Sequence, residues 1–313
     1  MINTLNLKKI LVSIVYFSSI SFVIYKFYQN RELIEGRFQD NYFFFLLLLV
    51  SFIFFQNFIA IKLFIIIKSY SKIKLNILNW LDIYFSGAVF NLTIFLTGLF
   101  YKAKKLKDLG LTYTEYGGLH FFNYIIHLVI MFLGLLVTML LLETKFLILY
   151  FIVSIYLILL FLIFFSPNLT IFLLTKIYLF TKINFLKKII NLITVIMSIF
   201  LNKKLIKYAV ILNILNYIFI ITLFYVVCTF FTNITIDEFI VLWSSKLIIE
   251  KLFVTHSLGF FNDILIALFS NFVGYDFDLA LMIQVTSRSC VMLSSILSLV
   301  TYKIFNSFLN NTN

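Results

Sequence analysis

Charged side chains are scarce in this sequence, so those inside long apolar stretches are the first candidates for function. Arg288 stands in the middle of "QVTSRSCVM", in a chain with only two other arginines, Arg31 and Arg37. A guanidinium group binds a carboxylate or a phosphate through two parallel hydrogen bonds, which an ammonium group cannot do. Arg288 is therefore expected to pair with Asp263, in the preceding apolar stretch, or to contact a lipid phosphate. The two roles are compatible if substrate binding exchanges the partners.

A second group of charges lies in the stretch that precedes Asp263. Lys246 and Glu250 are four residues apart, so they share one face of a helix with Trp243 and can form an ion pair along that face. A charge at the centre of a bilayer costs about 2.5–3.5 kcal/mol on insertion scales. The pair is therefore either an internally neutralised structural pair or part of the lining of a substrate cavity.

The histidines and cysteines offer no comparable signal. His120 and His127 are seven residues apart on one helix face, without a nearby carboxylate or cysteine pattern, and we interpret them as packing or helix–helix hydrogen-bonding residues. No Walker motif, nucleophile elbow, HExxH motif or cysteine pair is present. The sequence thus gives no positive evidence for catalysis, and we expect no catalytic residue, no metal and no cofactor.

These residues must be positioned by helices in a membrane. The chain of 313 residues is 63% hydrophobic and 12% charged, whereas soluble domains carry about 25% charged residues. A spanning helix needs about 20 apolar residues. We therefore predict an all-α, polytopic integral membrane protein that forms a single transmembrane domain over residues 1–313, with about six spanning helices. They include Ile10–Tyr28, Tyr42–Ile67, Gly118–Leu142, Phe146–Phe165, Leu205–Phe231 and a last one over residues 277–305.

The lysines predict how the chain threads through the membrane. The net charge is +12, but the lysines are spread along membrane-flanking loops, which predicts orientation rather than nucleic-acid binding. We place both termini in the cytosol. The lysine cluster Lys102–Lys107 then lies on the cytosolic side only if Asn79–Leu99, which polar residues interrupt, enters the membrane and returns to the same face.

A second hairpin is predicted near the C-terminus. The last span must end inside, at Lys303, and start outside, near Asp276, so Phe239–Val273 must leave from the outside and return there. Two broken elements of opposite orientation are typical of a transporter with a binding site at the membrane midplane. Between the two halves, lysines beside helically spaced apolar residues in Ser166–Lys204 indicate helices in the cytosolic interface.

Two motifs resemble those of the lysylphosphatidylglycerol synthase transmembrane-region family, which is flippase-like. The first is "FYKAKKLKDLGLTYTEY" after an apolar run. The family has there an Asn, a Pro and Gly-rich turn, a basic residue and a "YLK…GLS" pattern. The matching positions here are Asn91, Gly98, Lys102, Leu106, Lys107, Gly110 and Leu111.

The second motif of that family has a Pro/Gly turn, a Glu, a later Gly and an intramembrane Arg. Here "THSLGFFND", Gly274 and Arg288 take those places, and Asp263 stands where the family has Glu. Both turn prolines are missing, and Gly259 is displaced by one position. The resemblance adds Asn91 and Lys102 to the candidate substrate-binding residues Arg288, Asp263, Glu250 and Lys246.

The residues and the resemblance together predict a protein that translocates or binds an amphipathic lipid without ATP. The expected partners are membrane lipids, either an anionic phospholipid or a polyprenyl-linked glycolipid, and the expected location is the bacterial inner membrane. One alternative is a membrane-embedded glycosyltransferase, for which the acidic residues Glu32, Glu35 and Asp40 after the first helix are a weak match. Another is a non-catalytic component of cell-envelope polysaccharide biosynthesis.

Overall fold

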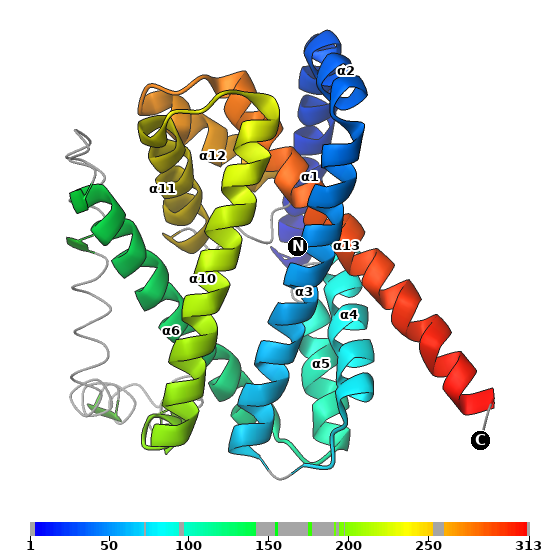
Figure 1. The fold of residues 1–313 in the computed structure, drawn as a ribbon. Coiled ribbons are helices and arrows are strands. Elements are labelled where there is room, and N and C mark those ends of the chain that lie inside the picture. The colour runs from blue at the N-terminus through cyan, green and yellow to red at the C-terminus, as the bar shows by residue number, and fades with distance from the viewer. Residues whose placement is uncertain are drawn as a thin grey trace. The chain divides into compact units, whose positions relative to one another are not determined.

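The regular elements of the described chain are all α-helices (Figure 1). The computed structural model describes residues 4–71, 73–93, 97–141, 198–252 and 260–311, with short pieces at 154–155, 175–176, 191 and 194–196. The helices are α1 (Thr4–Gln29), α2 (Arg31–Asp40), α3 (Tyr42–Tyr70), α4 (Ile77–Thr93), α5 (Thr97–Asp108), α6 (Tyr113–Leu141), α10 (Lys203–Phe231), α11 (Ile236–Leu252), α12 (Phe260–Phe272) and α13 (Phe277–Asn311).

Four of the described helices are long and apolar enough to cross a membrane. They are α3, α6 over Tyr113–Val137, α10, and α13 over Phe277–Phe305, and each overlaps a span predicted from the sequence. The first predicted span is also helical, as α1, but it is not among these four. Most of the predicted span Phe146–Phe165 and about two thirds of Ser166–Lys204 lie outside the described residues. The number of spans therefore stays a prediction, whereas the all-α class and the membrane-length helices are confirmed.

Several helices begin at a side chain that caps the free backbone N–H groups of the first turn. In α6, Thr112 and Glu115 form a reciprocal capping box, in which Glu115 Oε2 accepts from the Thr112 N–H at 2.8 Å. Thr235 and Glu238 do the same for α11, and Asp276 Oδ1 accepts from the Leu279 N–H of α13 at 2.7 Å. Such caps stabilise a helix by about 0.5–2 kcal/mol each, so these starts are determined locally.

Two helices end at a glycine in the left-handed region. Gly110, after α5, has φ +100°, and Gly274, after α12, has φ +98°. The Leu111 N–H donates to the Leu106 carbonyl at 3.0 Å, and the Tyr275 N–H donates to the Ser270 carbonyl at 2.9 Å. This is the Schellman arrangement, in which glycine avoids the steric cost of a positive φ. Both motif glycines therefore have a local role in ending a helix.

The chain divides into two compact units of discontinuous segments. The first unit comprises Met1–Gln56, Ala88–Leu96 and Ile220–Ser298, and the second comprises Asn57–Gly87, Thr97–Phe219 and Leu299–Asn313. The helices α3, α4, α10 and α13 each contribute residues to both units. The prediction of a single domain over residues 1–313 stays a prediction.

The first unit is built around α11. Nearly every side chain from Phe239 to Glu250 is buried, as expected of a helix with no polar face. Trp243 packs against Phe224 of α10, with ring centroids 5.5 Å apart. The helix α12 lies beside α11, and α1 packs against α12. The predicted hairpin Phe239–Val273 is thus two helices, α11 and α12, joined by residues 253–259, which include His256 and lie outside the described residues.

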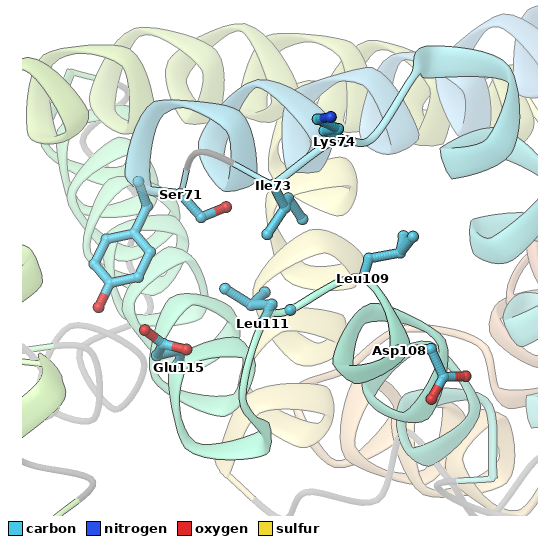
Figure 2. A pocket seen from close by; sticks show the side chains of 9 residues that line it. Ser71, Ile73, Lys74, Asp108, Leu109, Leu111 and Glu115 are labelled. Carbon is cyan, nitrogen blue, oxygen red and sulfur yellow. The ribbon is translucent and has the colours of Figure 1, made fainter.

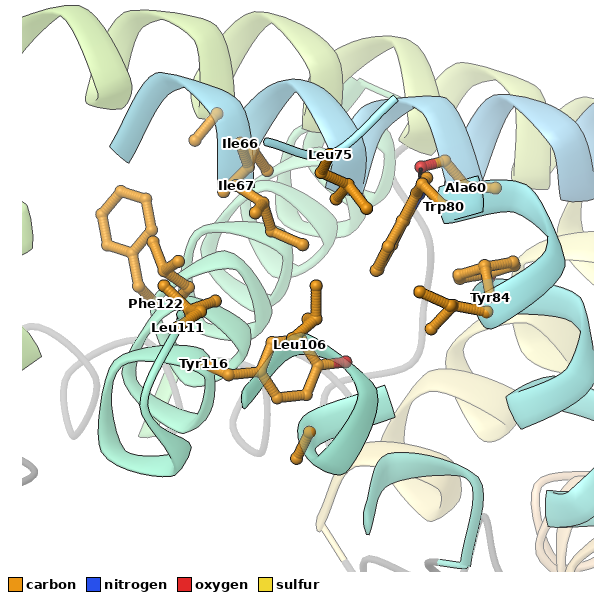
Figure 3. Close-up of a cluster of buried hydrophobic side chains, with 14 of the residues drawn as sticks. Ala60, Ile66, Ile67, Leu75, Trp80, Tyr84, Leu106, Leu111, Tyr116 and Phe122 are labelled. Carbon is orange, nitrogen blue, oxygen red and sulfur yellow. Dashed lines mark hydrogen bonds between the residues drawn. The ribbon is translucent and has the colours of Figure 1, made fainter. Parts of the chain in front are cut away.

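The second unit has an apolar core in which α3, α4, α5 and α6 meet (Figure 3). Trp80, Phe85 and Phe122 are its largest fully buried side chains. The indole Nε1 of Trp80 donates to the Ala60 carbonyl of α3 at 2.6 Å. The ring of Tyr302, near the end of α13, stacks on Phe85 at 5.7 Å.

The structure describes two helices, α4 and α5, over the predicted hairpin Asn79–Leu99. They pack closely where Gly87 of α4 lies against Gly98 of α5. A Cβ atom at Gly87 would lie 2.9 Å from the Gly98 carbonyl and 2.6 Å from Lys102 Cε. The second arm runs to Asp108, so the lysine cluster lies on a helix and not in a flanking loop. The lysines of the cluster lie on different faces of α5. Lys102 shares the buried face with Leu106, while Lys104 is exposed.

Candidate functional site

The guanidinium of Arg288 and the carboxylate of Asp263 are joined in the first unit. Arg288, on α13, donates from Nη2 to Asp263 Oδ1 at 2.9 Å, and its Nε donates to Oδ2. Asp263 is 0% exposed and lies in the first turn of α12, where the helix dipole favours a negative charge. This two-point contact matches the geometry that the sequence predicts for the pair.

A second ion pair lies on α11. Lys246 Nζ is 2.9 Å from Glu250 Oε1, one helical turn away. The same ammonium donates to Gln284 Oε1 at 2.9 Å and lies 5.2 Å from the centroid of the Phe224 ring. Gln284 and Arg288 are four residues apart on α13 and therefore share a helix face. Gln284 thus connects the Lys246–Glu250 pair to the helix face that carries Arg288.

Together the four residues Lys246, Glu250, Asp263 and Arg288 form one group of balanced charge, which we name the charge cluster. Its carboxylates are buried and its cations are partly buried. The charges of Lys246 and Glu250 act on Asp263 in addition to that of Arg288, so the two pairs are electrostatically coupled. Two cations and two anions balance, which avoids the several kcal/mol that an unpaired buried ion costs.

Beside the charge cluster, the side-chain amide N–H of Gln284 has no acceptor among the described residues. Gln284 is 0% exposed. Buried side-chain N–H groups are almost always bonded. An N–H donor therefore stands next to the charge cluster, available to an oxygen atom that enters the site.

The structure brings together four of the six residues predicted to bind substrate. Asn91 is exposed, in the last turn of α4. Lys102 is buried in the second unit, where its Nζ lies 4.3 Å from the centroid of the Tyr84 ring. Neither is part of the charge cluster.

Sequence reasoning missed two polar residues. Gln284 could have been found from the sequence, because it lies four residues before Arg288 in an apolar stretch and therefore shares its helix face. Lys62 lies inside the predicted span Tyr42–Ile67 and is only 3% exposed. The signal was the same as for Lys246, a lysine surrounded by apolar residues.

An open pocket of ≈ 870 Å³ lies elsewhere in the second unit (Figure 2). It is lined by Tyr70, Ser71, Ile73, Lys74, Asp108, Leu109, Gly110, Leu111 and Glu115. Glu115 is engaged in the capping box of α6. None of the six predicted site residues lines this pocket, so it is separate from the charge cluster.

Comparison with known proteins adds no relative. No family model matches the chain, and no curated protein or solved structure matches it either.

Proposed function

We propose that this protein translocates an amphipathic lipid with an anionic headgroup, and that Arg288 receives the headgroup phosphate. The observation that carries the proposal is the two-point contact of Arg288 with Asp263 inside an apolar helix bundle. A phosphate presents two oxygens to a guanidinium in the same geometry as a carboxylate. The ligand can therefore replace Asp263 without leaving Arg288 unpaired.

The charge cluster supplies what such an exchange needs. A lipid phosphate that displaces the Asp263 carboxylate leaves a negative group in a buried position, and Lys246 lies near enough to act on its charge. The Nε2 of Gln284, which has no acceptor among the described residues, offers the phosphate a further donor. With the phosphate bound, Arg288 keeps an anionic partner and Lys246 offsets part of the cost of the displaced Asp263 carboxylate, which lowers the electrostatic barrier to moving a headgroup through the bilayer.

The helices supply the rest of the pathway. The hairpins α4–α5 and α11–α12 are broken elements of the kind that lines polar cavities at membrane depth, while the acyl chains stay in lipid. The resemblance to flippase-like domains supports the same function. The alternative glycosyltransferase function rests on Glu32, Glu35 and Asp40 of the short helix α2, and no contact of the described residues favours it.

The test is transport in liposomes that contain fluorescent phosphatidylglycerol. Arg288→Lys keeps a positive charge next to Asp263 but loses the two-point contact, so we expect normal folded yield and loss of most lipid exchange between leaflets. Arg37→Lys is the matched control, because Arg37 is exposed on α2. Normal transport by Arg288→Lys would reject the role of Arg288 in binding the substrate.

A further inference from the structure

Three basic side chains come from three different helices of the second unit. They are Lys62 of α3, Lys102 of α5 and His120 of α6, and the two lysines are 3% and 8% exposed. Both lysines act electrostatically on His120. Two ammonium groups buried in a largely apolar unit favour an anion beside them, and a neutral imidazole can donate a hydrogen bond to it.

Lys102 is held by an aromatic ring and not by an acid. Its Nζ lies over Tyr84 at 4.3 Å from the centroid, and the missing side chain of Gly87 makes room for its Cε. It makes no ion pair with any carboxylate of the described residues. A cation–π contact contributes about 0.5–2 kcal/mol, less than the several kcal/mol that burying an ammonium costs. Tyr84 alone therefore does not offset the burial of this charge.

His120 offers an unused nitrogen to the same region. Its Nδ1 is buried and has no hydrogen-bond partner in the part of the chain that the structure describes. The ring of Tyr116 lies beside it, with centroids 6.2 Å apart. In the tautomer that carries a proton on Nδ1, this atom is a donor ready for an oxygen.

Lys62 is fixed by a chain of amides. Its Nζ donates to Asn213 Oδ1 of α10 at 3.0 Å, and Asn213 Nδ2 donates to Asn123 Oδ1 of α6 at 2.9 Å. Asn123 and His120 are three residues apart and so share a face of α6. The amide chain orients a second ammonium next to the histidine.

We propose that Lys102, His120 and Lys62 form a phosphate-binding site, in which Lys102 supplies the principal charge and His120 Nδ1 a hydrogen bond. This site uses none of the residues of the charge cluster. It joins Lys102, which the resemblance had made a candidate substrate-binding residue, to Lys62 and His120, which were not candidates. The phosphate is carried either by a phospholipid headgroup or by a free phosphate ion, since the same donors bind both.

The two tryptophans allow the two units to be tested separately. Trp80 packs beside Tyr84, with ring centroids 5.9 Å apart, and Trp243 lies in the first unit. In the Trp243→Phe protein, Trp80 fluorescence reports on the phosphate site. In the Trp80→Phe protein, Trp243 reports on the charge cluster, so failure of this site is distinguishable from failure of the proposed function.

The experiment titrates the purified full chain in dodecyl maltoside with inorganic phosphate, phosphatidylglycerol or, as a phosphate-free lipid, dioleoylglycerol. We expect a saturable change in Trp80 fluorescence with at least one of the two phosphate compounds and none with dioleoylglycerol. Lys102→Met should weaken binding at least tenfold, while Lys104→Met, at an exposed position of the same helix, should leave it unchanged.

The outcomes are separable. Saturation by inorganic phosphate supports a free-ion site, and saturation by phosphatidylglycerol alone supports a headgroup site. Lys102→Met removes a buried charge and keeps the aliphatic bulk, so it should retain the thermal stability of the parent protein, and lost binding cannot be ascribed to unfolding. No saturable response to either phosphate compound, or unchanged binding in Lys102→Met, would overturn the proposal.

Discussion

At the scale of residues, the protein handles buried charge in two ways. In the first unit, Arg288 and Asp263 neutralise each other, and Lys246 does so with Glu250. In the second unit, Lys102 is buried against Tyr84 without a carboxylate partner among the described residues. The first arrangement is stable when empty, whereas the second gains stability when an anion binds.

The Arg288–Asp263 pair predicts a coupling between two substitutions. Arg288→Ala or Asp263→Ala alone leaves one buried charge unpaired, which costs about 3–5 kcal/mol, whereas the double substitution removes both charges. We expect each single variant to lower the yield of folded protein and the double variant to recover part of it. The measurement is monodisperse protein after detergent extraction. Losses that simply add in the double variant would contradict the pairing.

Lys102 predicts a pH dependence for the phosphate site. Lys102 lies on α5, outside the four candidate spans, and burial lowers its pKa to about 8. Tyr84 lies against its ammonium group, and the charge of Lys102 acts on His120. Below pH 8 the ammonium is already charged, so affinity should be constant there. Above pH 8 binding must take up a proton, so affinity should fall by up to tenfold per pH unit.

The measurement repeats the Trp80 titration from pH 6.5 to about 9.5 with phosphatidylglycerol, whose phosphodiester does not titrate in this range. If only the free ion binds, the series is compared above pH 8 alone, where inorganic phosphate is already mostly the dianion. The Lys104→Met protein should follow the parent curve. Affinity that stays constant above pH 8 would show that Lys102 does not supply the charge.

At the scale of elements, both hairpins depend on how short helices are ended and packed. Glycine ends α5 and α12 with a positive φ, and Gly87 allows α4 and α5 to approach closely. A side chain is unfavourable at all three positions, for two different reasons. At Gly110 and Gly274 its cost comes from the positive φ, and at Gly87 it would collide with the neighbouring helix α5.

Gly110 predicts a loss of stability that is independent of packing. A Cβ at this position would be in ordinary contact only with Ile73, at 4.0 Å, so the cost of Gly110→Ala is that of the left-handed backbone, about 1–2 kcal/mol. Gly36→Ala is the control, because Gly36 lies within α2 and its Cβ would meet nothing within 4 Å. Thermal unfolding in detergent should show a lower transition for Gly110→Ala and an unchanged or higher one for Gly36→Ala.

At the scale of the whole molecule, the proposed transport requires the second hairpin to open from one side of the membrane. Asp237, at the start of α11, and Asp276, between α12 and α13, are both exposed. A hairpin places these positions on the same side, whereas a single span would place them on opposite sides.

The test is labelling of single cysteines with a membrane-impermeant maleimide, after Cys228 and Cys290 have been replaced by alanine. Asp237→Cys and Asp276→Cys should both react from outside intact cells, and Lys104→Cys should react only after the cells are opened. Opposite accessibility of Cys at positions 237 and 276 would contradict the hairpin and the transporter-like arrangement.

The sequence by itself determined the features that depend on local composition and spacing. Apolar stretches such as Tyr42–Ile67 are helical because a backbone in lipid must satisfy its own hydrogen bonds. Polar and small residues within Asn79–Leu99 favoured two elements over one span, and the structure describes α4 and α5 there, while the re-entrant path stays a prediction. The isolation of Arg288 among apolar residues pointed to Asp263 as its partner. Each of these inferences depends only on residues within one segment, or on the rule that a buried charge needs a partner.

The tertiary structure decided what depends on contacts between distant segments. Lys62 and Asn213 are 151 residues apart, and no spacing rule connects them. Lys102 looks like its neighbours Lys104 and Lys105 in the sequence, yet it is buried because α4 and α6 pack against its face of α5 and Gly87 leaves space for its side chain. Whether a residue is buried depends on which helix packs against it. Only the tertiary structure therefore distinguishes a lysine that orients the chain in the membrane from a lysine that can bind a ligand.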